Sequence, residues 1–237
     1  GGDVAAPRVE IVAEMCANPS HLETVTPVVL GRVRALHDTG HSALGVIVHG
    51  DASFCGQGIV SEALTMSNLA QYTTRGAVHV VCNNRVGFTT PTLPGKYATD
   101  VAKTIGAPVL HVNADDVDQC VEAALVAVDW VHTHKRDVVL DVVGYRRLGH
   151  NELDVPGYTH PCTYRAIAAH PPAIKRYEKQ LREFGVATPR DFAERRAALL
   201  RTYRRELERA ETEVAPRTDW FVSSWQRYAF EDYADPA

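Results

Sequence analysis

Four short apolar runs rich in valine and isoleucine recur along the chain, and each is followed by a segment with helical periodicity. The runs occupy residues 44–48, 77–82, 108–112 and 138–143. Runs of this length and β-branched composition are typical of strands buried on both faces of a parallel sheet. Their regular alternation with helices predicts an α/β fold built on a doubly wound parallel sheet.

The chain is expected to divide into two parts. We predict an α/β domain over residues 1–160 and a helical extension and linker over residues 161–237. Alternation also suggests a further strand near the start, and an aromatic tail closes the sequence at Trp220, Phe221 and Trp225. The expected strand covers residues 8–16, and the expected helices cover residues 22–37, 59–72, 99–105, 117–131, 175–184 and 191–214.

Polar motifs follow the first two apolar runs. His49-Gly50-Asp51-Ala52 ends the first run and Asn83-Asn84 ends the second. In open α/β sheets, ligands bind outside the carboxyl ends of the strands. Mg²⁺ takes oxygen ligands and is commonly held by one or two protein groups together with phosphate oxygens. We therefore predict that Mg²⁺ is bound by the Asp51 carboxylate, the Asn84 amide oxygen and the main-chain carbonyl of Val86.

A glycine turn lies between these two motifs. Gly56-Gln57-Gly58 precedes a helical pattern, and a helix N-terminus offers free N–H groups and a dipole that favour an anion. Either polar motif alone would usually be an ordinary turn. Their positions at two strand ends, with this turn between them, predict a clamp for a metal-bound diphosphate.

Composition excludes several other classes of function. The formal charge of −4 gives no reason to expect a nucleic-acid partner, and the basic residues between Lys175 and Arg209 alternate with glutamate, as on a solvated helix face. The five cysteines are widely spaced, without a zinc or disulfide pattern. No apolar run approaches membrane-spanning length, so no membrane association is expected.

Seven ordered motifs carry a family resemblance that covers roughly residues 14–180. They are residues 18–23 (NPSHLE), 49–52 (HGDA), 56–58 (GQG), 84–90 (NRVGFTT), 111–116 (HVNADD), 145–147 (YRR) and 149–152 (GHNE). A GDG-like motif followed some thirty residues later by Asn-Asn marks thiamin diphosphate enzymes, and Asp51 and Asn84 are 33 residues apart. The whole set resembles the E1 component of 2-oxoglutarate dehydrogenase.

The resemblance implies a thiamin diphosphate-binding fold and two cofactors, thiamin diphosphate and Mg²⁺. By this resemblance Met15 and Cys16 would lie against the cofactor rings. The diphosphate would be bound near Asp51 and Asn84, with additional contacts from Ala52, Gly56 and Gln57. Two departures affect loops: the segment from Pro91 to Ala98 is shorter than in the family, and Leu148 replaces a more polar residue. Ala52 also stands where the wider superfamily has glycine.

Three histidines are candidates for catalysis. His49 and His21 fall near the ligand-binding edge of the sheet, and His150 belongs to a loop that resembles the one closing over the diphosphate in related enzymes. An imidazole that titrates near neutrality suits diphosphate contact and proton transfer. Arg146 or Arg147 is expected to pair with a phosphate or a substrate carboxylate, since a guanidinium binds such groups bidentately.

The implied activity of the parent protein is oxidative decarboxylation of 2-oxoglutarate, with succinyl transfer to the lipoyl group of an E2 partner in the tricarboxylic acid cycle. Family members work with E2 and E3, form homodimers, and are found in the mitochondrial matrix or the bacterial cytoplasm. Residues 49–60 and 89–91 also resemble the 2-oxoadipate dehydrogenase E1 of lysine degradation, so the length of the 2-oxo acid stays open.

Other readings remain. The second catalytic domain of the family is not visible in this sequence, so the chain is expected to be inactive alone, as an excised diphosphate-binding domain. It could instead be a noncatalytic cofactor-binding subunit. A different α/β nucleotide-binding protein is a weaker alternative, because the GxxxxGK[ST] and GxGxxG patterns are absent.

Overall fold

The computed structural model describes residues 11–18, 20–88, 90–91 and 97–213. The chain forms two compact units, residues 1–179 and 180–237. The first unit contains the sheet and the candidate site. The domain boundary that we placed after residue 160 falls between the last strand of the sheet and the C-terminal helices, and it stays a prediction.

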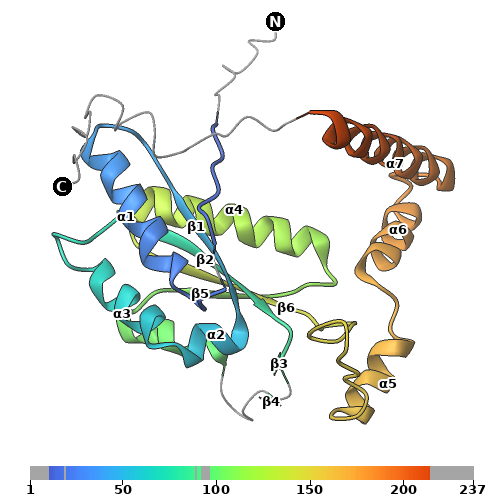
Figure 1. Ribbon diagram of the computed structural model, residues 1–237, viewed down its shortest axis with the longest axis horizontal. Coiled ribbons are helices and arrows are strands. Elements are labelled where there is room, and N and C mark those ends of the chain that lie inside the picture. The colour runs from blue at the N-terminus through green and yellow to red at the C-terminus, as the bar shows by residue number, and fades with distance from the viewer. Residues whose placement is uncertain (1–10, 19, 89, 92–96, 214–237) are drawn as a thin grey trace, which may run out of the picture. The chain divides into compact units, whose positions relative to one another are not determined.

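A four-stranded parallel sheet forms the centre of the first unit (Figure 1). The strands lie in the order β1-β2-β6-β5. Gly50 pairs with Cys82 at the end of β1, and Asn83 pairs with Val143 at the end of β2, so the carboxyl ends meet at one edge. All four strands confirm the apolar runs; they are β1 (Gly45–Gly50), β2 (Ala77–Asn83), β5 (Val109–Asn113) and β6 (Val138–Val143).

Helices cover both faces of this sheet, which confirms the doubly wound arrangement. On one face, Phe54, Val60, Leu64 and Ala102 pack with Val81 and Val139 of the strands. On the other face, Ala127 and Val131 pack with Val78 and Val138. The side chains of neighbouring strand residues point to opposite faces, so two continuous apolar layers form. The helices of the first face are α2 (Asp51–Gly56), α3 (Gly58–Ser67) and the 3₁₀ helix η1 (Ala98–Ile105), and α4 (Val117–His134) covers the second.

Helix α1 (Val25–Asp38) precedes β1, as predicted. The short strands β3 (Val86–Gly87) and β4 (Thr90–Pro91) pair antiparallel after β2, in a segment for which no strand was predicted. Helices α5 (Pro161–Ala169), α6 (Ala173–Glu183) and α7 (Pro189–Thr212) confirm the helical character of the C-terminal part. The predicted aromatic tail lies outside the described residues. Within the described ranges, none of the helices has the length and apolar character needed to cross a bilayer.

Some local expectations were wrong. The described residues 11–16 of the expected first strand form no strand, and the side chains of Ile11 and Met15 are 85% and 94% exposed. Residues 51–56 form a helix that the sequence pattern did not indicate, whereas the helix expected over residues 99–105 is confirmed as the 3₁₀ helix η1. Strand β1 is an edge strand whose second face is not buried, since Val46 and Val48 are exposed in the described chain.

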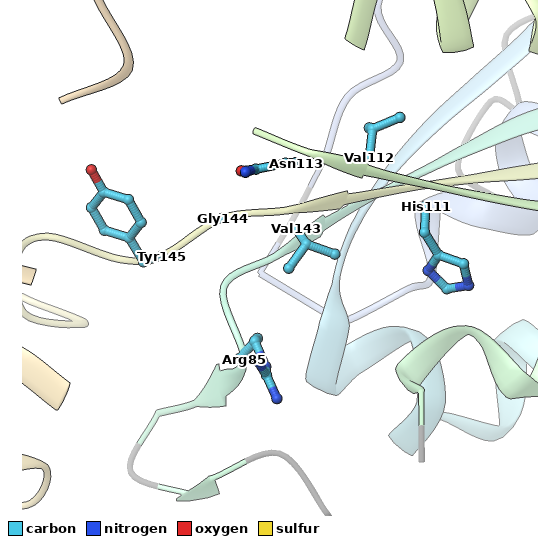
Figure 2. A pocket seen from close by; sticks show the side chains of 7 residues that line it. All are labelled: Arg85, His111, Val112, Asn113, Val143, Gly144 and Tyr145. Carbon is cyan, nitrogen blue, oxygen red and sulfur yellow. The ribbon is translucent and has the colours of Figure 1, made fainter. Parts of the chain in front are cut away.

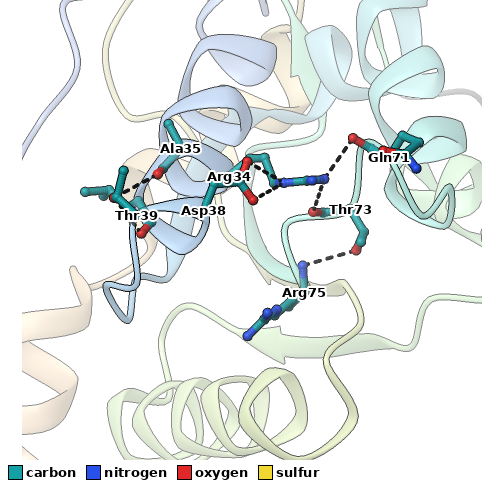
Figure 3. Close-up of polar contacts among 8 residues, drawn as sticks. Arg34, Ala35, Asp38, Thr39, Gln71, Thr73 and Arg75 are labelled. Carbon is teal, nitrogen blue, oxygen red and sulfur yellow. Dashed lines mark hydrogen bonds and ion pairs between the residues drawn. The ribbon is translucent and has the colours of Figure 1, made fainter.

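Arg34 connects α1 to the loop that leads into β2 (Figure 3). Its Nε lies 2.9 Å from Oδ1 of Asp38, and its Nη1 donates to the main-chain oxygens of Gln71 (2.8 Å) and Thr73 (3.4 Å). Carbonyl groups of an irregular loop need partners of this kind when no strand or helix supplies them. The contacts fix the loop that turns the chain back toward β2.

Gly76 lies at the end of that loop, and its replacement by alanine tests the geometry. The backbone of Gly76 has a φ of +91°, and a Cβ there would lie 2.6 Å from the main-chain oxygen of Arg136. We expect Gly76→Ala to lower the free energy of unfolding by about 2 kcal/mol, since backbone strain and a steric clash combine. Urea unfolding measures the change.

Gly40 is the matched control. Its φ of +87° is similar, but no atom lies within 4 Å of a Cβ built there. Gly40→Ala should cost only the strain of the left-handed backbone, on the order of 1 kcal/mol. Equal losses in the two variants would show that the contact with Arg136 contributes nothing.

Candidate cofactor site

Asp51 lies where β1 gives way to α2. Gly50 keeps an extended backbone and precedes the helix, so Asp51 becomes the first residue of α2 at the carboxyl edge of the sheet. The residue is buried, and burial raises the pKa of its carboxyl group, while backbone N–H groups that include those of Asn84 and Arg85 lower it less. The carboxylate therefore faces the turn after β2, as the paired strand ends predicted.

The turn after β2 holds its polar side chains by local hydrogen bonds. Asn83 Oδ1 accepts the N–H of Arg85 at 3.1 Å, and Asn84 Oδ1 accepts the N–H of Val86 at 3.1 Å. Arg85 has a φ of +61°, which closes the turn. An amide oxygen has two lone pairs, so the bond to Val86 orients Asn84 and leaves one lone pair for a cation.

The side chain of Asp141 stabilises this turn through a hydrogen bond to Asn83. Its side chain is fully buried on β6, where Oδ1 accepts a hydrogen bond from Nδ2 of Asn83 at 3.0 Å and Oδ2 lies 2.7 Å from Nδ1 of His111. Buried carboxylates persist in folded proteins when hydrogen bonds satisfy them. Asn83 is thus fixed at both ends of its amide, and the neighbouring Asn84 is positioned by the same turn.

Ala52 and Gly87 account for the close approach of the two motifs. A Cβ built at Gly87 would lie 2.6 Å from the Cβ of Ala52, closer than side-chain carbons can pack. Alanine at position 52, where the wider superfamily has glycine, is accommodated because position 87 is glycine. The pair brings the main chain at Val86 close to the start of α2.

The donor set fits a magnesium-bound diphosphate. In the described part of the chain, Asp51 forms no ion pair with a cationic side chain, and no group of three or more His, Cys, Asp or Glu residues is arranged to hold a metal. One carboxylate with neutral oxygens is a set that Mg²⁺ uses when phosphate oxygens complete its shell. The extended Gln57 separates α2 from α3, and a Cβ at Gly58, the first residue of α3, would meet nothing within 4 Å, so the start of α3 is open to an anion.

The loop after β6 lies against the turn after β2. The rings of Phe88 and His150 are 4.9 Å apart, and Arg146 Nη2 donates to the main-chain oxygen of Phe88 at 3.0 Å. The N–H of His150 donates to Oδ2 of Asp154 at 2.9 Å. His150 therefore lies at the same edge as Asn84, and its contact with the diphosphate stays a prediction.

The two candidate arginines differ. The Arg146 side chain is 16% exposed, and its buried Nε has no hydrogen-bond partner within the described ranges. Arg147 is exposed. A buried N–H donor without a partner is costly, and an anion that entered beside it would satisfy it. Arg146 is the better placed of the two.

The remaining predicted site residues are His49, His21, Met15 and Cys16, which differ in how far they are buried. His49 is buried, with Nδ1 2.7 Å from Oε2 of Glu23 and Nε2 3.0 Å from Nδ1 of His79. His21 is exposed in the turn before α1, Met15 is exposed, and Cys16 is half-buried. The roles of His21, His49, Met15 and Cys16 stay predictions.

An open cavity of about 440 Å³ lies at the ends of β2, β5 and β6 (Figure 2). Arg85, His111, Asn113 and Tyr145 are among its lining residues, whereas Asp51 is not. The cavity therefore adjoins the proposed metal position without containing it. Sequence reasoning assigned no role to the supporting residues Glu23, His79, Asp141 and Phe88: Glu23 and Phe88 lie within the motifs at residues 18–23 and 84–90, whereas His79 and Asp141 lie in apolar runs and carry no motif.

Comparison with known proteins agrees with this geometry. The model of the dehydrogenase E1 component family matches residues 8–218. The chain is 41% identical over 222 residues to the mitochondrial 2-oxoglutarate dehydrogenase of Dictyostelium discoideum, which covers 90% of this chain and 22% of the relative. It is 40% identical over 229 residues to a mitochondrial 2-oxoglutarate dehydrogenase-like protein of Xenopus laevis, with 93% and 22% covered.

A third relative, the mitochondrial 2-oxoglutarate dehydrogenase of Saccharomyces cerevisiae, is 39% identical over 223 residues, with 90% of this chain and 22% of the relative covered. The chain thus spans about a fifth of the length of the curated relatives that it matches. The family match covers most of the sequence and includes every strand of the sheet. The chain belongs to the dehydrogenase E1 component family.

Proposed function

We propose that this chain is the thiamin diphosphate- and Mg²⁺-binding part of the E1 component of a 2-oxoglutarate dehydrogenase. The observation that carries the proposal is the buried carboxylate of Asp51, which faces the turn of Asn84 at adjoining strand ends. Relatives whose alignment covers 90% of this chain are named 2-oxoglutarate dehydrogenases. The parent protein would decarboxylate 2-oxoglutarate oxidatively and transfer the succinyl group to the lipoyl group of E2.

Each group of residues has a defined task in this proposal. Asp51, Asn84 and the carbonyl of Val86 hold Mg²⁺, which binds the diphosphate. The open backbone at Gly56 and Gln57, beside Ala52, faces the diphosphate oxygens, and Met15 and Cys16 contact the cofactor rings. Thiamin diphosphate supplies the carbanion chemistry by which CO₂ leaves the 2-oxo acid.

The histidines and Arg146 act around the bound groups. His150 lies in the loop packed on Phe88, where its imidazole contacts the diphosphate and exchanges protons with the reacting centre. Arg146 offers its unpaired Nε to an anionic group at the same edge. His21 lies in an exposed turn from which its ring reaches the substrate.

The remaining features of the parent enzyme follow from the same proposal. The chain spans a fifth of its relatives, so a second catalytic domain, homodimer formation and the E2 and E3 partners are assigned to the complete protein. The names of the relatives favour the mitochondrial matrix, and a bacterial enzyme would be cytoplasmic. The isolated chain is expected to be inactive.

Two measurements test the function. Calorimetric titration with thiamin diphosphate should show binding that requires Mg²⁺, in the complete protein and, if the site forms alone, in the 237-residue chain. The complete protein should release CO₂ from 2-oxoglutarate faster than from 2-oxoadipate at equal concentration. A preference for 2-oxoadipate would assign the sister enzyme, and binding of a nucleotide in place of thiamin diphosphate would reject the proposal.

A further inference from the structure

Three buried polar side chains connect the segment before α1 to the first two strands. Oε2 of Glu23 lies 2.7 Å from Nδ1 of His49, and Nε2 of His49 lies 3.0 Å from Nδ1 of His79. Exposed fractions are 9% for Glu23, 3% for His49 and 1% for His79. The three residues come from the turn before α1, from β1 and from β2, so their contacts join parts distant in sequence.

The Glu23 carboxylate fixes the direction of the first hydrogen bond in this row. A carboxylate only accepts hydrogen bonds, so Nδ1 of His49 donates to Glu23. One proton is shared between Nε2 of His49 and Nδ1 of His79, and either nitrogen can be its donor. Burial lowers the pKa of His79 to about 3, which keeps His79 neutral. Both nitrogens of His49 are occupied, and its ring has no free position for a substrate.

Glu23 also has an unusual backbone. Its φ is +64°, in the left-handed region that residues other than glycine seldom adopt. Such a conformation costs about 1–3 kcal/mol and persists where surrounding contacts determine it. Here the Glu23 carboxylate accepts from His49 and from Oγ1 of Thr26, the latter at 3.1 Å. The side chain thus holds the turn in a conformation that the backbone alone would not choose.

The turn held by Glu23 carries His21. Thr24 donates from Oγ1 to the main-chain oxygen of His21 at 2.8 Å, and from its N–H at 3.2 Å. His21 is therefore part of the turn that the Glu23 side chain joins to β1. His49, the hydrogen-bond partner of Glu23, lies on β1 two residues before Asp51, which begins α2.

We propose that Glu23 is a positioning residue: by accepting a hydrogen bond from His49, it fixes the turn that carries His21 relative to the strand end that carries Asp51. This inference rests on the proposed function. It also changes the expected role of His49: His49 binds the carboxylate that positions the turn, and it does not contact the substrate. Glu23 itself touches neither metal ligands nor reacting atoms in this arrangement.

Glu23→Ala in the complete E1 protein tests the inference. We expect the affinity for thiamin diphosphate and Mg²⁺ to stay within about threefold, since the Asp51 and Asn84 motifs are intact. The kcat for decarboxylation should fall by about 30–100-fold, because a displacement of about 1 Å in a positioned group can cost this much. Hydrogen–deuterium exchange should rise in a peptide covering residues 20–26 and not in one covering residues 51–66.

Glu23→Gln is the conservative variant. Its amide oxygen still accepts the His49 hydrogen bond, so kcat should return to within about fivefold of the wild type. Glu14→Ala is the matched control. Glu14 also lies in the segment before α1, and it forms an ion pair with Arg32 at the surface. Ion pairs at the surface contribute little to stability. Glu14→Ala should leave kcat and exchange unchanged.

The outcomes separate the two proposals. Wild-type protein that binds no thiamin diphosphate rejects the proposed function, whereas the exchange measurement still reports on the tie between Glu23 and the turn. A Glu23→Ala protein with wild-type kcat and exchange overturns the positioning role. Loss of cofactor affinity in that variant, or a Glu23→Gln protein as impaired as the alanine variant, also overturns it.

Discussion

Replacement of Asp51 by asparagine should weaken thiamin diphosphate binding by about 100-fold or more while the cofactor-free chain keeps or gains thermal stability. Even outer-shell substitutions at metal sites typically cost 10–100-fold, so the loss of a charged ligand should reach at least the upper end. Stability should move the other way, because burial raises the pKa of the Asp51 carboxyl and an ionised buried carboxylate destabilises the folded chain. Asparagine keeps the shape and removes that charge.

Calorimetric titration in the presence of Mg²⁺ and a thermal melt without ligands check the two halves of this expectation. Asp129→Asn is the control, since Asp129 is exposed on α4, far along the chain from either motif, and neither quantity should change. Wild-type affinity in Asp51→Asn would remove Asp51 from the metal site. A markedly lower melting temperature would show that the carboxylate stabilises the fold, contrary to the effect expected from its burial.

A stability gain coupled to a binding loss is the usual mark of a functional group held where the fold alone would not place it. Asp51 could be predicted from sequence because its signal is local: a carboxylate directly after a strand, with Asn83-Asn84 after the next one. The four strands could also be predicted from sequence, because a run of β-branched residues indicates a buried strand even when the neighbouring strands are unknown. The paired strand ends then followed from parallel topology.

The supporting residues could not be predicted in the same way. Glu23 and His79 meet His49 across 26 and 30 positions, and His111 and Asn83 meet Asp141 across 30 and 58. Such contacts depend on which segments become neighbours in the fold, and the hydrophobic pattern of a single segment does not specify its partners. A histidine in an apolar run looks the same whether it is isolated or hydrogen-bonded.

Two errors in secondary structure have related causes. The alternating residues 8–16 satisfied a strand pattern, but a strand needs a partner edge, and the described residues 11–16 have none. Helix α2 was missed because six residues ending in glycine have little intrinsic preference for a helix. It forms because Phe54 is fully buried against the sheet, so tertiary packing decides its conformation.

His79 should make the chain sensitive to acid. Burial lowers its folded pKa to about 3 from the ordinary value of 6.5, so between these values the unfolded chain binds more protons than the folded chain. The stability is therefore full above pH 6.5 and is lost as the pH falls toward 3. The whole span corresponds to about 5 kcal/mol, and the part between pH 7 and pH 5 to about 2 kcal/mol, at ~1.4 kcal/mol per pH unit.

Glu23 adds to this loss of stability in acid. Burial raises the pKa of its carboxyl group, but hydrogen bonds from His49 and Ser53 outweigh burial and lower the pKa. Protonation of the carboxylate in acid therefore removes stabilising hydrogen bonds. Asp51 and Asp137 oppose this loss, since burial raises both of their pKa values and acid relieves that cost. The informative quantity is therefore the difference between wild type and His79→Gln, a neutral variant that still offers an N–H donor.

Urea unfolding of the wild type and His79→Gln at pH 7, 6 and 5 should show their difference in free energy shrinking by about 2 kcal/mol toward acid, since only the wild type carries the penalty of charging a buried imidazole. His132→Gln, at an exposed position of α4, should track the wild type at every pH. If the His79→Gln difference stayed constant across this range, the imidazole would be charging inside the fold without cost. The row from Glu23 to His79 would then be open to water or proton exchange, and the rigid support that it is inferred to give to the His21 turn would lose its physical basis.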